Sequence, residues 1–118
     1  PKASVDSTDL VNIQLSNWLE AWENQDADSY LSFYSRQFNS PKGNRSKWET
    51  SRHRALKANT NLSVQVSNIQ ISQSEEMIEL NFIQTFKSDN YSDVGIKELV
   101  WAKNGNDWKI LKETWLSS

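Results

Sequence analysis

The sequence has no cysteine, a single histidine, two prolines and three glycines. The lack of cysteine excludes disulfide bonds, thiolate metal sites and cysteine nucleophiles. One histidine, His53, cannot form a multi-histidine metal site. No run approaches the roughly 18 consecutive apolar residues that span a bilayer, so we expect no direct membrane insertion. The formal net charge of -2 provides no overall positive field, so nucleic acid is not an expected partner.

Several catalytic signatures are also missing. The sequence has no G-x-S-x-G nucleophile elbow, no glycine-rich phosphate loop and no H-E-x-x-H zinc motif. We therefore expect no cofactor and no bound metal ion. What the chain does have is six tryptophans, three tyrosines and four phenylalanines within 118 residues, a length that suits one domain with a hydrophobic core.

The first forty residues predict two helices after a short tail. Residues 1–6 are expected to be a linker, and residues 7–118 a single domain. Ser7 or Thr8 can cap a first helix that runs to about residue 24, because apolar residues recur there at steps of three and four: Val11, Leu15, Trp18, Leu19 and Trp22. Asp26 or Asp28 can cap a second, short helix that ends before residue 38 and carries Tyr30, Leu31, Phe33 and Tyr34.

A third helix is predicted after a loop at residues 39–46, which contains Pro41 and Gly43. Ser46 and Glu49 have the spacing of a capping box, so the helix is expected to open at Ser46. Its end is expected at residues 59–61. Its inward face is expected to carry Trp48, Arg52, Ala55 and Leu56.

From residue 62 onward the apolar period changes to two, which predicts four strands joined by turns at residues 73–76, 87–90 and 104–107. The alternation of the first strand changes phase near Ser67 and Asn68. A β-bulge there would keep its side chains on the correct face. The predicted fold is α+β, with three N-terminal helices packed on a strongly curved antiparallel four-stranded meander.

Three segments resemble the nuclear transport factor 2-like superfamily. They are "WLEAWENQDADSYLSFYSRQF" (18–38), Trp48 with "SRH" (51–53), and "FIQTFKSDNYSDVGIKELVWAKNGNDWKILKETW" (82–115). The last segment looks like the variant fused behind bacterial L,D-transpeptidase-type cell-wall enzymes. This resemblance implies a cystatin-like cone, a periplasmic or exported location and covalent fusion to other domains. The start at Pro1 without an initiator methionine also leads us to expect a piece of a longer protein.

The superfamily cone holds a pocket between helices and sheet, and the resemblance implies one here. Aromatic walls suit planar rings or sugars, although the same rings can simply fill the cone. The expected ligand-pocket residues are Trp18, Trp22, Tyr30, Tyr34, Trp48, Arg52, Gln84, Phe86, Lys97, Trp101, Glu113 and Trp115.

Lys97 and Glu113 fall on adjacent predicted strands among apolar neighbours. Either both point inward, as a buried pair that orients a ligand or acts as acid and base, or they form a cross-strand salt bridge on the surface. Gln84 is a polar residue on an otherwise apolar face. It must find a hydrogen-bond partner, either a ligand or a backbone group.

Two further features are open to alternative interpretations. His53 is a candidate general base, paired with Asp26 or Asp28, or a half-exposed helix residue. The third helix and the loop before it are basic, and either meet an anion such as a carboxylate-bearing glycan or peptide or form a solvated face. These basic residues are Lys42, Arg45, Lys47, Arg52, Arg54 and Lys57.

Three functional hypotheses follow. The first is a non-catalytic accessory domain of a larger exported cell-wall-related protein, binding a small molecule, glycan, peptide or partner chain in the cone. The second is a small isomerase, dehydratase or cyclase, with His53 or Glu113 as base and Tyr30 or Tyr34 as oxyanion donor. The third is a module that forms a homodimer through the outer sheet face, which predicts exposed Val94, Ile96 and Val100.

Overall fold

The computed structural model describes residues 7–38, 44–58, 61–74, 76–89, 91–105 and 107–117. Three helices, α1 (Ser7–Glu23), α2 (Ala27–Ser32) and α3 (Arg45–Ala58), precede four strands, β1 (Ser63–Gln73), β2 (Met77–Lys87), β3 (Ser92–Asn104) and β4 (Asp107–Ser117). The strands form one antiparallel sheet in the order β1-β2-β3-β4, which confirms the predicted α+β meander. The predicted linker at 1–6 and the capping side chains of Ser7 and Thr8 lie outside the described part. Within the described ranges, no helix has the length and apolar character needed to cross a membrane.

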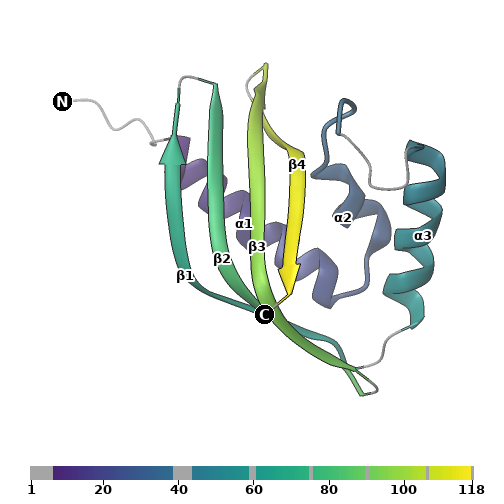
Figure 1. Ribbon diagram of the computed structural model, residues 1–118. Coiled ribbons are helices and arrows are strands. Elements are labelled where there is room, and N and C mark those ends of the chain that lie inside the picture. Colours follow the sequence, from purple (N-terminus) through teal and green to yellow (C-terminus); the bar gives the residue numbers. More distant parts are fainter. Residues whose placement is uncertain are drawn as a thin grey trace.

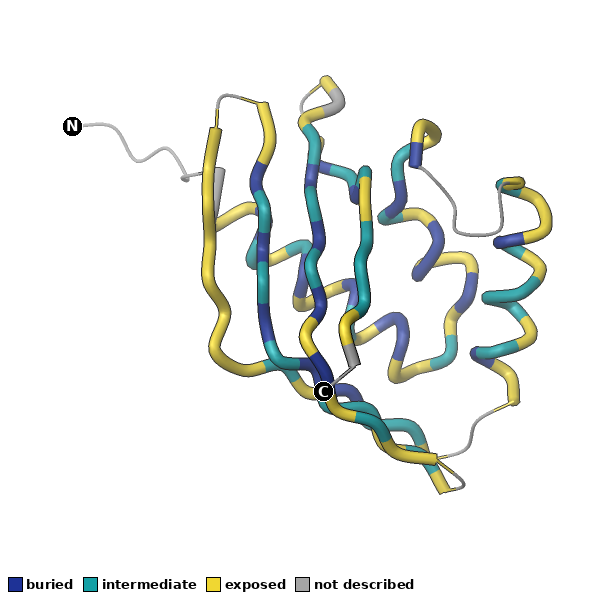
Figure 2. The backbone as a smooth tube through the Cα atoms, in the orientation of Figure 1, coloured by how far each residue is buried: buried dark blue, intermediate teal, exposed yellow. Residues whose placement is uncertain are grey.

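The sheet curves around α1, while α2 and α3 lie beyond the β4 edge (Figure 1). The apolar stripe of α1 packs on the concave face, and Val11, Leu15 and Trp18 are buried there as predicted. The concave face of the two central strands supplies the other half of the core, including Ile78, Leu80, Phe82, Leu99 and Trp101. β1, at the sheet edge, is exposed along most of its length (Figure 2).

Two bulges bend the sheet. The β1–β2 register shifts between Ser67 and Gln70, and Asn68 has a φ of 52°, so the predicted bulge is confirmed. A second shift lies in the β3–β4 pair, where Leu111 is the extra residue between Ile110 and Lys112. We did not predict this second bulge, although the inward residues of β4 change from even to odd numbers at that point.

The second helix is shorter than predicted. Asp26 caps α2, and its Oδ1 accepts a hydrogen bond from the Ser29 N–H at 3.2 Å. The prediction that the helix continues through Tyr34 is wrong, because the chain leaves it to pair with β4. Ser35 N–H donates to the Ile110 carbonyl at 2.8 Å, and Ile110 N–H donates to the Phe33 carbonyl at 2.7 Å. This isolated bridge joins the segment after α2 to the edge of β4 at Ile110.

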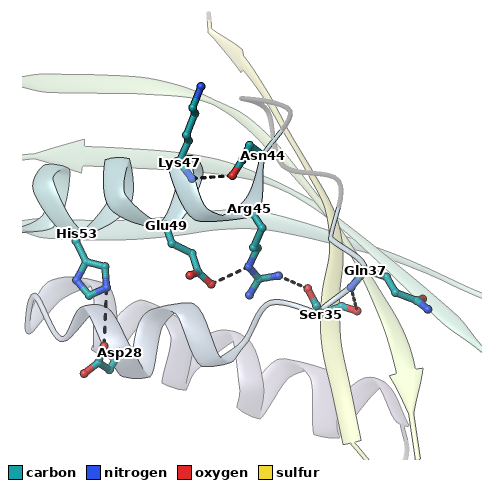
Figure 3. A network of polar contacts seen from close by, with 8 residues as sticks. All are labelled: Asp28, Ser35, Gln37, Asn44, Arg45, Lys47, Glu49 and His53. Atoms are coloured by element: carbon teal, nitrogen blue, oxygen red, sulfur yellow. Dashed lines mark hydrogen bonds and ion pairs between the residues drawn. The ribbon is translucent and has the colours of Figure 1, made fainter.

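The cap of α3 also differs from the prediction. Asn44 is the capping residue, since its Oδ1 accepts from the Lys47 N–H at 3.1 Å (Figure 3). The Ser46–Glu49 capping box is therefore wrong: the helix begins at Arg45, which places Ser46 inside its first turn. Glu49 instead accepts from Arg45 Nε at 2.8 Å, one helical turn away.

The outer face of the sheet exposes part of the predicted apolar patch. Val94 and Ile96 are exposed as predicted. Val100 is half-buried, so its predicted exposure is wrong. In the register Val100 lies between Glu79 and Lys112, and long charged side chains shield apolar neighbours with their methylene groups.

Gly95 is a point where β3 tolerates no side chain. A Cβ there would lie 2.6 Å from the Leu116 carbonyl oxygen and 2.7 Å from Cζ2 of Trp115. We expect Gly95→Ala to lower the free energy of unfolding by about 2 kcal/mol, because an overpacked site must shift its neighbours. Urea denaturation measures this loss, and an unchanged midpoint would contradict the packing described here.

Candidate functional site: a cleft beside a buried ion pair

The deep part of the cone is filled with side chains. Trp18 and Trp101 are 0% exposed and Tyr34 is 4% exposed, all within the hydrophobic core. These three predicted pocket residues therefore pack as core and do not line an open space. The reason is the position of α1, which crosses the concave face and brings Trp18 onto the sheet.

An open cleft remains between α3, the end of α1 and the inner face of β2, β3 and β4. It consists of two adjoining hollows of about 440 Å³ and about 240 Å³, with Trp22, Arg52 and Trp115 lining both. We refer to the two hollows together as the cleft. Nine of the twelve predicted pocket residues line it: Trp22, Tyr30, Trp48, Arg52, Gln84, Phe86, Lys97, Glu113 and Trp115.

Lys97 and Glu113 form an ion pair on the inner face of the sheet. Lys97 lies opposite Phe82, and Glu113 lies opposite Leu99, both of which point into the core. Their side chains are only 7% and 16% exposed. The alternative of a surface salt bridge is therefore wrong, and both charges form part of the cleft wall.

A hydrogen-bond network holds the Glu113 carboxylate. The Tyr34 hydroxyl donates to Oε1 at 2.7 Å, and Lys97 Nζ donates to Oε2. The Tyr34 oxygen accepts in turn from Trp18 Nε1 at 3.2 Å and lies 3.0 Å from the Tyr30 hydroxyl. Because Tyr34 gives its only proton to Glu113, Tyr30 is the donor in the tyrosine pair.

The environment determines the protonation state of these groups. Burial alone would raise the pKa of Glu113, but the charge of Lys97 and hydrogen bonds from Lys97 and Tyr34 lower that pKa below its ordinary value. Burial raises the pKa of Tyr30 to about 12, and burial followed by repulsion from Glu113 raises the pKa of Tyr34 well above its ordinary value. At neutral pH Glu113 is thus an anion, and both tyrosines remain protonated donors.

Three tryptophans surround the ammonium group of Lys97. Its Nζ lies 5.9, 5.7 and 5.5 Å from the ring centroids of Trp18, Trp22 and Trp115. Cation–π attraction at such distances adds to the ion pair in fixing the side chain. Lys97 is therefore a rigid positive group in the cleft wall.

Arg52 contributes a second cation. Its guanidinium carbon lies 5.9 Å from the Trp22 ring centroid and 5.2 Å from the Tyr30 ring centroid. Its Nε is buried and has no hydrogen-bond partner in the described part of the chain, and the same holds for Oε1 of Gln84. Gln84 faces inward as predicted, at 4% exposure.

His53 lies outside the cleft. Its Nε2 is 3.8 Å from Oδ1 of Asp28, and the pair faces solvent, with side chains 41% and 95% exposed (Figure 3). The structure brings these two predicted residues close together, but it places them away from the other site residues. Across the described ranges, no group of three metal-binding side chains gathers.

The predicted basic residues of α3 do not share one environment. Arg52 turns into the cleft, Arg45 pairs with Glu49, and Lys47, Arg54 and Lys57 are exposed. Lys42 lies outside the described residues.

Four cleft residues were not among the predicted pocket residues: Ala55, Tyr91, Asp93 and Thr114. Of these, Ala55 was predicted only as part of the inward face of the third helix. Asp93 and Lys97 are separated by an even number of positions on β3, so their side chains lie on the same face of the sheet. This alternation would have identified Asp93 as a cleft residue. Tyr91 precedes β3 and has no such periodic signal.

Sequence comparison places the chain with known domains. Residues 10–114 match the family model described as Cds6 C-terminal NTF2-like domain. No curated protein sequence matches the chain.

Solved structures share the fold. Bd1075 from Bdellovibrio bacteriovorus is 28% identical with a TM-score of 0.83, over 92% of this chain and 39% of that one. The helical cell shape determining protein Pgp2 from Campylobacter jejuni is 25% identical with a TM-score of 0.70, over 85% of this chain and 38% of that one. An NTF2-like protein from Cytophaga hutchinsonii is 18% identical with a TM-score of 0.76, over 97% of this chain and 100% of that one. The chain thus spans about two fifths of the length of the first two.

Removing the carboxylate of Glu113 should destabilise the fold, because Lys97 would be left charged and unpaired. We expect Glu113→Gln to lower the free energy of unfolding by about 3 kcal/mol near neutral pH. The pKa of Glu113 is depressed in the folded state, so its stabilisation is complete above the ordinary glutamate pKa and declines as the pH falls through the folded value. The difference from the wild-type protein should therefore shrink in acid, as measured by urea denaturation across the pH range.

Glu98→Gln is the matched control, since Glu98 is a half-buried glutamate on the outer face of β3. An equal loss in both variants, or a Glu113 effect that does not change with pH, would contradict the assignment.

Proposed function

Because the chain belongs to the Cds6 C-terminal NTF2-like domain family, we propose that it is a non-catalytic binding domain whose cleft takes a small molecule, a glycan or a peptide segment of a partner chain. The observation that carries this proposal is an open cleft walled by Trp22, Trp48 and Trp115 with fixed charges from Lys97 and Arg52. Tryptophan faces pack on sugar rings and other flat apolar surfaces, while fixed polar groups orient the ligand.

The state of the polar groups favours binding over catalysis. Both oxygens of Glu113 already accept hydrogen bonds, and its depressed pKa makes it a weak proton acceptor. The Tyr34 hydroxyl is committed to Glu113, so it has no proton for an oxyanion. His53 lies outside the cleft. These features are the reason for preferring a binding domain over an isomerase, dehydratase or cyclase.

The wider context of the proposal is a cell-wall protein. Pgp2 is described as a cell shape determining protein, and its chain is longer than this one. We propose that residues 7–118 form one domain of a larger periplasmic or exported protein, fused to an L,D-transpeptidase-type enzyme as the closing strands suggest. The ligand of the cleft would then be a fragment of peptidoglycan, which carries both sugars and short peptides.

Muropeptide binding tests this proposal. Titration of ¹⁵N-labelled protein with muropeptides should shift the indole signals of Trp22 and Trp115. Trp115→Ala should weaken binding at least about tenfold, because an aromatic wall of the site is lost. Ile13→Ala is the control: Ile13 lies on α1, is 54% exposed and lines neither hollow.

The control should bind as the wild-type protein does. A titration in which no indole signal moves, or in which both alanine variants lose affinity equally, would count against a ligand in the cleft.

A second candidate function, dimerisation, rests on the outer sheet face. Ile83, Ile96 and Leu116 lie side by side in the register of β2, β3 and β4, and Ile96 and Leu116 are 47% and 57% exposed. A row of apolar side chains on a sheet face suits contact with a second copy.

We expect sedimentation velocity to show a dimer that Ile96→Asp converts to monomer, since the substitution places a charge in the apolar contact. Thr50→Asp adds the same charge at an exposed position of α3, away from the sheet, and should leave the dimer intact. A wild-type protein that sediments as a monomer at high concentration would rule out this candidate.

A further inference from the structure

Arg52 is a cation in the cleft without a counter-ion. Among the described residues, the Lys97 and Arg45 side chains each have a glutamate within ion-pair distance, whereas no carboxylate lies within 4 Å of Arg52. Its close neighbours are Trp22 and Tyr30, whose ring faces do not neutralise a full charge. The Tyr30 side chain also hydrogen-bonds to the guanidinium, and the charge of Glu113 attracts it from beyond ion-pair distance. Since half-buried charges are normally paired, a guanidinium lining both hollows suits an anionic group brought by the ligand.

The acidic groups of the cleft are already occupied. Glu113 accepts hydrogen bonds from Lys97 and Tyr34. Asp93, at the smaller hollow, accepts from the Tyr91 hydroxyl at 2.8 Å and from the Val94 N–H at 2.9 Å. Neither lies at ion-pair distance from Arg52, so the guanidinium remains the open charge of the site.

Gln84 adds a polar group that requires a donor. Its side chain lines the smaller hollow at 4% exposure, and its Oε1 has no partner in the described structure. Leaving a buried acceptor unpaired is costly. Its neighbour on β3 is Gly95, which has no side chain to supply a donor. The terminal amide of a glutamine rotates readily, so the oxygen can turn toward an N–H in the hollow.

We propose that the cleft recognises a carboxylate that follows an amide N–H, the group found at the C-terminal end of a peptide. Arg52 binds the carboxylate, because a planar guanidinium offers paired N–H donors that match its two oxygens. Gln84 accepts the amide N–H, and the shared walls Trp22 and Trp115 contact the apolar part of the residue. This proposal deepens the proposed function by naming the part of the ligand that is read.

Two small peptides that differ only in the terminal group test whether the cleft recognises a carboxylate. N-acetyl-alanyl-alanine, in its L,L and D,D forms, is titrated into ¹⁵N-labelled protein as the free acid and as the C-terminal amide. The free acid of at least one form should shift the Arg52 Nε–Hε signal and the Trp22 and Trp115 indole signals, and its amide should bind at least about tenfold more weakly. Equal affinity of acid and amide, or no shift by any probe at millimolar concentration, overturns the proposal.

Substitutions on α3 test whether Arg52 is responsible for the preference for acid over amide. Arg52→Gln should abolish the preference for acid over amide. Arg54→Gln removes the same charge from an exposed position on the same helix and should keep the preference. Retention of the preference in Arg52→Gln overturns the assignment, and the comparison of probes on the wild-type protein does not depend on whether this variant folds.

A depsipeptide probe tests Gln84. N-acetyl-alanyl-lactate has an ester oxygen in place of the amide N–H, so it should bind several-fold more weakly than N-acetyl-alanyl-alanine. Gln84→Leu should remove this difference. Equal binding of ester and amide-linked acids by the wild-type protein overturns the part assigned to Gln84.

Failure of this inference and failure of the proposed function have different signatures. If muropeptides shift the cleft signals while acid and amide probes bind equally, the binding domain stands and the carboxylate proposal falls. If the small acids are discriminated while muropeptides do not bind, the carboxylate site stands and the cell-wall ligand falls.

Discussion

The ion pair of Lys97 and Glu113 is the constraint on which the cleft depends. Two charges on the concave face of a sheet must be paired and hydrogen-bonded, because their desolvation is costly. Tyr34 and Trp18 meet this requirement by extending a chain of hydrogen bonds from Glu113 into the core. The aromatic core and the charged wall are therefore one unit, and neither part can be altered without affecting the other.

The positions of α1 and α3 explain why the cone is filled at one side and open at the other. α1 presses Trp18 against the inner face, where Trp101 is fully buried. Past this point the wall turns polar, and α3 stands away from β4 with Arg52 directed into the space. Gly95 matters here, since any side chain at that position would displace Trp115 and change the wall of the cleft.

A rigid wall of this kind suits selection of a ligand more than proton transfer. Lys97 is fixed by Glu113 and by three ring faces, so it offers a charge whose position is set before the ligand arrives. Arg52 differs because no carboxylate in the described part of the chain lies within ion-pair distance of its guanidinium. Under the proposed function, the paired cation Lys97 belongs to the structural part of the site, and Arg52 belongs to the part that would contact the ligand.

Helical periodicity, strand periodicity and the break at Ser67–Asn68 are local signals, and they were enough to predict three helices, four strands and the first of the two bulges. The alternation of side chains along β2 also identified Gln84 as an inward-facing residue. The other features depend on how the chain packs in three dimensions. Asn44, and not Ser46, caps α3 because the helix begins at Arg45. Tyr34 lies outside α2 because its neighbours Phe33 and Ser35 form backbone hydrogen bonds with Ile110 of β4. Which aromatic rings fill the cone and which line it depends on where α1 and α3 rest against the sheet, a long-range packing result that no local pattern encodes.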